Sequence, residues 1–156
     1  MTCSLDRFFN TFIADDAQYS MSKYMESEGD EDLKASAWKA TRKDDGQLVR
    51  SRVVRYIHPI NAPLAPPKAG ARKEQTYQRF NDYGICVETK TFVDDVPMAD
   101  CFFVKDRLLV SASSTKDRVT VVMEFELEFV KSTMFRGVIT KTTTSEMSKF
   151  FQNMRD

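Results

Sequence analysis

Apolar residues at every second position over 119–129, with glutamates between them from position 124, constrain the fold more than any other feature. The apolar set is Val119, Val121, Met123, Phe125, Leu127 and Phe129, and the intervening charged set is Glu124, Glu126 and Glu128. Side chains of a strand point alternately to the two faces of its sheet. This segment is therefore predicted to be a long antiparallel strand with one apolar face and one face in water.

The tail that follows changes to a helical period. Its recurring positions are Phe135, Val138, Ile139, Thr142, Thr143, Met147, Phe150 and Met154, at the three- and four-residue steps of one helix face. The threonine run at 140–145 is unusual for a helix, because β-branched residues lose rotamer freedom there. Two helices with a loop between them are the alternative, but we favour one long helix. A strand with one apolar face, followed by such a helix, predicts a curved sheet that grips a helix around a solid or a hollow interior.

The rest of the chain completes an α+β layout. Apolar spacing predicts a helix over 5–13 with Ser4 as its N-cap, and a second over 17–28, capped by Asp15 or Asp16. Strands are expected at 33–42, 47–57, 72–81, 85–91 and 102–112, with a turn at 43–46 and a long proline-rich loop at 61–71. At 156 residues the chain is expected to form one domain, 1–156, with helices against one side of a bent sheet.

Composition excludes several classes of protein. Lys plus Arg and Asp plus Glu both total 23, so net charge predicts no partner. The three cysteines are widely spaced, which favours a reducing compartment over a disulfide framework. No apolar run approaches the roughly 20 residues that span a bilayer, and the N-terminus lacks the pattern of a signal peptide. We expect a soluble protein that faces the cytosol.

Catalytic and metal-binding patterns are weak. The one histidine, His58, could form a dyad with Cys86 or Cys101, but no spacing supports this, and a loop histidine is the simpler interpretation. Zinc sites need closely spaced Cys or His pairs, and the chain has none. The aspartates of segment 94–100 could mimic an acid–base pair but fit turn chemistry better. We therefore predict no enzyme activity, no metal and no cofactor.

Basic residues concentrate between positions 34 and 79, where the sequence has eleven basic residues and only three acidic ones. Such a region could contact anionic lipid headgroups, where each cation contributes on the order of 1 kcal/mol. It could equally be the exposed face of a hairpin. Nucleic acid is not expected, because the region lacks the interleaved aromatic side chains that stack on bases.

Four short motifs, in this order and spacing, resemble those of a known family. They are Gly29-Asp30 with Trp38, Asn61-Ala62-Pro63-Leu64, Asp95-Val96-Pro97, and Phe129-Val130-Lys131-Ser132-Thr133 followed by Gly137 and Ile139. With them the chain is similar, from about residue 5 to 154, to the VASt domain. This is a StART-like lipid-transfer module found in Aster and Lam proteins and in plant GRAM-domain proteins.

The resemblance implies a helix-grip fold: a curved antiparallel sheet around a long C-terminal helix, with two short N-terminal helices. It also implies a cavity that holds one sterol for transfer between membranes. The side chains expected to line it are Ile85, Val87, Val104, Leu108, Val110, Val121, Met123, Phe125, Leu127, Ile139, Thr142 and Thr143, with Thr142 or Thr143 facing the sterol hydroxyl. The lid loop would contain Asn61, Pro63, Leu64, Ala65 and Pro66, and Lys68, Arg72 and Lys73 would dock on the membrane.

Three functional hypotheses follow. The first is a monomeric lipid-transfer module for a sterol, or for a related lipid such as a phospholipid, that contacts anionic membranes transiently. It would act at the cytoplasmic face of the endoplasmic reticulum or at membrane contact sites. The second is an interaction or regulatory domain of the same fold with a filled core and no transfer activity. The third, a hydrolase or cyclase on a related scaffold, is disfavoured by the single histidine.

Overall fold

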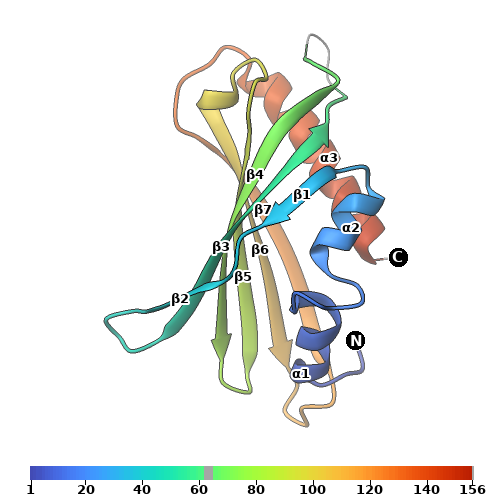
Figure 1. Ribbon diagram of the computed structural model, residues 1–156, viewed down its shortest axis with the longest axis vertical. Helices are drawn as coiled ribbons and strands as arrows, with labels where there is room; N and C mark the ends of the chain where they lie inside the picture. Colours follow the sequence, from blue (N-terminus) through green and yellow to red (C-terminus); the bar gives the residue numbers. More distant parts are fainter. Residues whose placement is uncertain (62–64, 156) are drawn as a thin grey trace.

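A curved antiparallel sheet is covered on one side by helices from both ends of the chain (Figure 1). The computed structural model describes residues 1–61 and 65–155. Its helical elements are α1 (Leu5–Phe8), the π-helical turn η1 (Phe9–Ile13), α2 (Met21–Ser27), the short 3-10 helix η2 (Ala99–Cys101) and α3 (Arg136–Arg155). Its strands are β1 (Glu31–Ala35), β2 (Lys39–Arg42), β3 (Leu48–Pro59), β4 (Lys68–Phe80), β5 (Gly84–Val93), β6 (Phe102–Ala112) and β7 (Val119–Phe129). This arrangement confirms the predicted helix-grip fold.

The sheet follows the chain as a meander, in the order β1-β3-β4-β5-β6-β7, and β2 also pairs with β3. The single strand predicted over 33–42 is wrong. Ala35 pairs with Val54 and Lys39 pairs with Ser51. An advance of four residues along 35–39 therefore matches an advance of only three residues along β3. The extra residue is a bulge that divides the segment into β1 and β2, and beside it the ring of Trp38 lies over Arg52.

The N-terminal helices differ in detail from their prediction. Ser4 caps α1 as expected, with its Oγ 3.2 Å from the backbone nitrogen of Arg7. The second helix begins four residues later than predicted, because Ser20 rather than Asp15 or Asp16 provides its cap. Residues 14–20 instead cross between the two helices, which leaves Asp15 available for contacts with the sheet.

The proline-rich connection is shorter than predicted. Pairing between Pro59 and Lys68 starts β4 directly after the last proline, so the connection ends at residue 67 rather than 71. The small residues Ala69 and Ala71 alternate inward and are buried. Of the predicted lid residues, Asn61, Ala65 and Pro66 lie in this connection, whereas Pro63 and Leu64 lie outside the described residues.

The C-terminal helix α3 is continuous, which confirms the choice of one helix over two. Thr142 and Thr143 are half-buried on the same face as Ile139 and Met147, while Thr140 and Thr144 face the solvent. The match of this face to the sheet outweighs the weak helix propensity of threonine. None of the described helices combines the length and apolarity needed to cross a bilayer.

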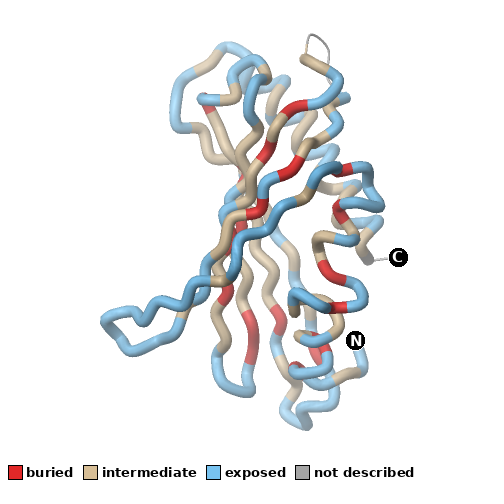
Figure 2. Tube along the Cα trace, in the orientation of Figure 1, coloured by how far each residue is buried: buried red, intermediate tan, exposed pale blue. Residues whose placement is uncertain are grey.

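Two clusters of buried apolar residues lie toward opposite ends of the concave face, and Figure 2 also marks buried segments of the strands between them. At one end Leu5 and Phe8 pack on Ile85 and Val110, and the Arg79 guanidinium, 2.6 Å from the Asp6 carboxylate, ties α1 to β4. At the other end the core residues are Met25, Tyr56 and Ala71, with Phe150 of α3 packed against them. The Tyr24 hydroxyl donates a 2.6 Å hydrogen bond to the Phe150 carbonyl. The N-terminal helices therefore close one end of the space under the sheet and brace α3 at the other.

Gly84→Ala is expected to destabilise the fold by about 1–3 kcal/mol, because a Cβ there would lie 2.7 Å from the Val110 carbonyl oxygen. The matched control is Gly137→Ala in the first turn of α3, where a Cβ would meet nothing within 4 Å. That change should stabilise by up to about 1 kcal/mol, since alanine favours helix. Urea unfolding of both variants measures the difference, and equal effects would contradict the close strand approach at Gly84.

Candidate functional site

The concave face of the sheet carries every strand residue predicted to line a cavity. Their cross-strand pairs place them in phase: Ile85 opposite Val110 and Val110 opposite Val121, Val87 opposite Leu108 and Leu108 opposite Met123, Val104 opposite Leu127, and Phe125 opposite Asp106. The rings of Phe125 and Phe151 lie 5.8 Å apart, which shows that this face meets α3. Ile139, Thr142 and Thr143 are half-buried on the same side of the helix. The structure therefore brings the twelve residues to one interior.

The middle of this interior is not close-packed. Val87, Leu108, Val121, Met123, Phe125 and Leu127 all point inward yet remain half-buried. No residue of α3 from Arg136 to Met154 falls in the buried class either. Inward side chains in a close-packed core keep almost no accessible surface. This pattern is the one expected of side chains that border a space other side chains do not fill.

Three of the twelve predicted residues differ from the rest in burial. Ile85 and Val110 are each 1% exposed and belong to the packed end under α1. Val104 is 7% exposed, next to the row where the polar residues begin. These three form walls of the interior, and whether they touch a ligand stays a prediction.

A row of polar side chains that was not predicted from the sequence crosses the middle of the concave face. The paired positions are Arg52, Gln75, Thr89 and Asp106, in that order across β3, β4, β5 and β6. Arg52 Nε donates a 2.8 Å hydrogen bond to Gln75 Oε1. Lys73 is the next residue of β4 on the same face as Gln75, and its Nζ donates a hydrogen bond to Thr91 Oγ1 at 3.0 Å. The otherwise apolar interior therefore has a polar belt.

Both charged groups at the centre of this belt have shifted pKa values. Burial lowers the pKa of Lys73, against the opposing attraction of Asp106 and Asp30. Burial also raises the pKa of Asp106, although Lys73 and a hydrogen bond with Thr89 favour its ionised form. Desolvation therefore dominates at both sites. Lys73 and Asp106 are both half-buried, on the face of the sheet that meets α3.

The periodicity of the strands carried a signal for this belt. Asp106 stands in phase with Val104 and Leu108, and Thr89 stands in phase with Val87. A charged residue at an inward position of an alternating strand is an exception that indicates either a buried network or a site. The proximity of Lys73 to Asp106 could not be predicted from the local sequence, because it depends on the register of β4 against β5 and of β5 against β6.

Comparison with known proteins identifies the fold's family. The family profile described as "VAD1 Analog of StAR-related lipid transfer domain", VASt, matches residues 1–146. The chain belongs to the VASt family. The chain is 24% identical over 144 residues to Protein VASCULAR ASSOCIATED DEATH 1 of Arabidopsis thaliana, covering 91% of this chain and 23% of that protein. It is 25% identical to human Aster-B over 134 residues and to human Aster-A over 126 residues.

The Aster matches cover 84% and 79% of this chain, and 18% and 17% of those proteins. This VASt chain therefore spans less than a quarter of the length of the curated relatives that it matches. Family membership and the fold together show a StART-like lipid-binding domain.

The three cations predicted to dock this VASt domain on a membrane are engaged elsewhere. Lys73 points into the interior, so its predicted contact with a membrane surface requires correction. Lys68 Nζ lies 2.6 Å from Glu31 Oε1. The Arg72 guanidinium covers the ring of Phe92 at 4.1 Å and lies 3.6 Å from Asp94. For Lys68 and Arg72 the docking role stays a prediction, but their charges are already partly offset.

The single histidine of the VASt domain sits in a strand rather than in the proline-rich loop. His58 Nδ1 lies 2.6 Å from Asp30 Oδ1, and its ring meets Tyr56 edge-on. The pKa of the Cys86 thiol is raised by burial and that of the Cys101 thiol by desolvation and Asp100. Within residues 1–61 and 65–155, no hydrogen bond joins His58 to either thiol. The described geometry therefore does not assemble the dyad of His58 with Cys86 or Cys101.

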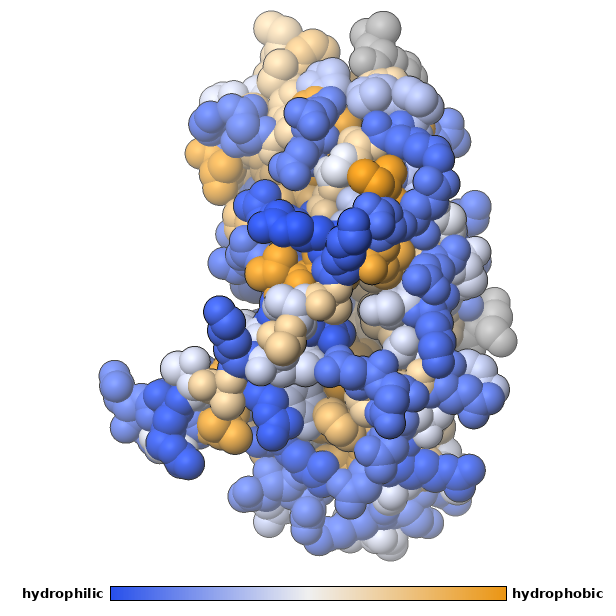
Figure 3. Space-filling view, in the orientation of Figure 1, coloured by the Kyte–Doolittle hydropathy of each residue, from blue (hydrophilic) through white to orange (hydrophobic). Residues whose placement is uncertain are grey.

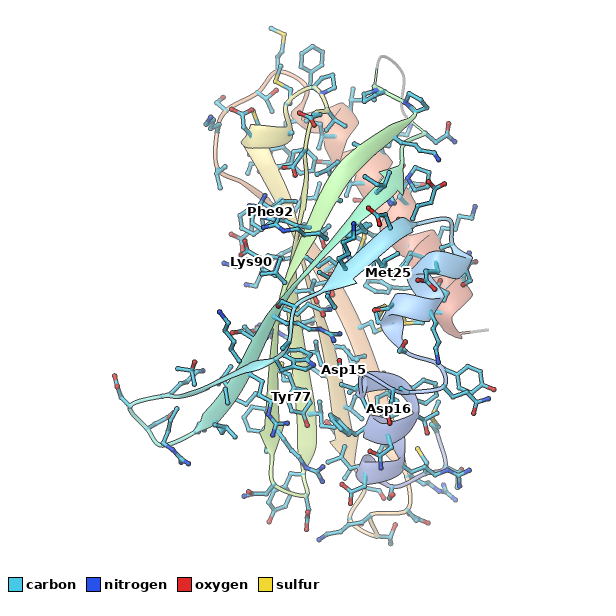
Figure 4. All side chains as sticks on the ribbon, in the orientation of Figure 1. Asp15, Asp16, Met25, Tyr77, Lys90 and Phe92 are labelled. Carbon is cyan, nitrogen blue, oxygen red and sulfur yellow. The ribbon has the colours of Figure 1, made fainter. Side chains whose placement is uncertain are left out.

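Asp15 ties the N-terminal segment of the VASt domain to the sheet. Its carboxylate accepts from Arg52 Nη1 at 2.5 Å and from Trp38 Nε1 at 3.2 Å. Clefts of about 310 Å³ and 270 Å³ flank this contact, and the second reaches Tyr77. Figure 4 labels Asp15 next to the N-terminal helical segment. Arg52 thus links an exposed carboxylate to the interior Gln75. This link holds the N-terminal helices over the concave face.

Proposed function

We propose that this VASt domain binds one sterol, or a similar lipid with one hydroxyl, between the sheet and α3 and transfers it between membranes. The observation that carries the proposal is the band of inward apolar side chains that remain half-buried, interrupted by one polar belt. A sterol is mostly hydrocarbon, and burying its surface contributes about 25 cal/mol per Å². That gain offsets the loss of the membrane environment.

The polar belt has the chemistry that a hydroxyl needs. A buried hydroxyl is costly unless it both donates and accepts a hydrogen bond. Lys73 has donors beyond the one given to Thr91, and Asp106 is an acceptor facing the same interior. Among the described residues no ion pair joins these two groups, so a hydroxyl could bridge them. We therefore assign the hydroxyl to Lys73 and Asp106 rather than to Thr142 or Thr143.

Transfer breaks no covalent bond, so its rate is set by opening of the interior and by contact with the membrane. We propose that the domain works as a monomer at the cytoplasmic face of the endoplasmic reticulum or at membrane contact sites. The family supports a lipid-binding role, and the cellular site and the identity of the lipid belong to the proposal.

The proposal is tested by titrating a fluorescent sterol, delivered from cyclodextrin, into the purified domain. Saturation near one sterol per chain is expected, together with faster transfer between two vesicle populations. The matched ligand control is the same sterol with its hydroxyl oxidised to a ketone, which can accept but not donate. It should bind more weakly. Absence of saturable binding for sterols and phospholipids would favour an interaction domain instead.

A further inference from the structure

Large apolar side chains are exposed at one end of the molecule. Of the eleven large hydrophobic residues that are exposed within the described chain, five lie on two segments: Met98, Val130, Met134, Phe135 and Val138. Met134 is 91% exposed. These segments are the β5–β6 connection and the β7–α3 connection with the first turn of α3. Figure 1 places both at the upper end, where Figure 3 shows apolar side chains at the surface.

Direct contacts join the two segments into one surface, here called the apolar tip and defined by those five residues. The backbone nitrogen of Val130 donates to the Cys101 carbonyl at 2.8 Å. Lys131 forms an ion pair with Asp100 across the same junction. Cys101 itself is buried, and its backbone nitrogen bonds to the Met98 carbonyl at 2.9 Å. Met98 is therefore anchored to the segment that carries Met134.

The backbone of the apolar tip is ordered by its own hydrogen bonds. Thr133 Oγ1 accepts from the nitrogen of Phe135 at 3.2 Å, and the Phe135 carbonyl accepts from Ile139 at 3.0 Å as α3 begins. The guanidinium of Arg136 lies 4.3 Å from the ring of Phe129, beneath the tip. Apolar side chains are thus held in water by a fixed scaffold. A clustered, exposed apolar surface of this kind indicates a contact site.

We propose that the apolar tip inserts into the headgroup–acyl boundary of a lipid bilayer, and that insertion rather than charge attraction seats the domain on membranes. The inference rests on the proposed transfer function and names the surface that function would use. The tip projects from the end of the molecule, as a group that penetrates a fluid surface must. Apolar groups of membrane-surface proteins penetrate about 5–10 Å into this boundary.

The charges around the tip identify the type of bilayer. Lys131 is offset by Asp100, and Arg72 is offset by Asp94 on the same β5–β6 connection. Arg136, over the Phe129 ring, and Asp95 are also exposed here and add one charge of each sign. A rim with both signs gives little net attraction to anionic lipids. The partner that fits this surface is therefore a neutral, zwitterionic bilayer.

The test is co-sedimentation of the domain with phosphatidylcholine vesicles, with and without phosphatidylserine. Met134→Asp should lower partitioning into both vesicle types by about tenfold or more, because it places a charge where an apolar group must be buried. Tyr83→Asp is the matched control: Tyr83 is 76% exposed in the turn at the opposite end, and its change should have no effect. In a Met134→Trp variant, the additional tryptophan fluorescence should be quenched by vesicles of brominated phosphatidylcholine.

Unchanged partitioning of Met134→Asp would overturn the inference, as would binding that requires phosphatidylserine and is lost on changing Lys68 or Arg72. The inference would also be overturned if the domain bound neither vesicle type and the tip instead bound another protein. Sterol binding from cyclodextrin separates this failure from failure of the proposed function. Met134→Asp should bind sterol in solution as the unmodified domain does, while its vesicle-to-vesicle transfer falls about tenfold.

Discussion

Phe125→Asp is expected to abolish lipid binding or folding, whereas Glu126→Ala should change neither measurably. Phe125 lies on the concave face, 5.8 Å from the Phe151 ring and directly opposite Asp106. A second carboxylate there would be desolvated and would repel one whose pKa is already raised by burial. Glu126 points to the other face, where it is mostly exposed and pairs with Lys105 at 3.3 Å. Exposed ion pairs contribute little to stability.

A milder change at the same position separates a hollow interior from a filled one. Truncation of a phenylalanine in a close-packed core costs about 3–5 kcal/mol. Phe125 is only half-buried, so Phe125→Ala should cost clearly less in urea unfolding, while sterol affinity falls. A cost within the close-packed range, with no sterol bound by the unmodified domain, would instead show that the sheet and α3 mesh solidly.

The parts of the fold set by local periodicity could be predicted from sequence. The alternation over Val119–Phe129 fixed which side chains of β7 face α3, because a strand has no freedom in this respect. The inward face of α3, which includes Thr142 and Thr143, could be predicted for a similar reason. A helix keeps its period along its length when one stripe of side chains packs against a sheet. These two patterns account for the predicted lining residues on β7 and α3, and those on β5 and β6 follow from the strands predicted at 85–91 and 102–112.

Features that depend on pairing between distant strands could not be predicted. The bulge between β1 and β2 exists only relative to β3, and the proline-rich connection is shortened by pairing of Pro59 with Lys68. Lys73 looked like part of a basic surface because it follows Arg72 within the basic region 34–79. Its inward direction follows from the register of β4, which sets it opposite Thr91 of β5. The proposed contact of Lys73 with a lipid hydroxyl was missed for this reason.

The combined change Lys73→Met and Asp106→Leu is expected to preserve or raise stability while weakening sterol binding. Replacing buried charges with apolar groups of similar volume is often neutral or stabilising, by about 1–4 kcal/mol. A hydrogen bond to a charged group is worth about 1.5–3 kcal/mol, so loss of the hydroxyl's partners should reduce affinity about tenfold to a hundredfold. Thermal unfolding and sterol titration give the two quantities. The matched control is Lys105→Met, which removes a cation from the outer face of the same sheet.

The pH dependence of the stability difference provides a second check on this pair. The lowered pKa of Lys73 means that its charge opposes folding, and this penalty disappears as the pH rises toward the ordinary value of 10.5. The raised pKa of Asp106 gives a penalty that disappears as the pH falls toward 3.8. The stability advantage of the double variant should therefore be largest between these two pH limits, where both groups are charged, and should shrink toward each limit.

If the double variant bound sterol as tightly as the unmodified domain, the hydroxyl would have to lie away from the polar belt. Equal stability at every pH would show that neither charge opposes folding.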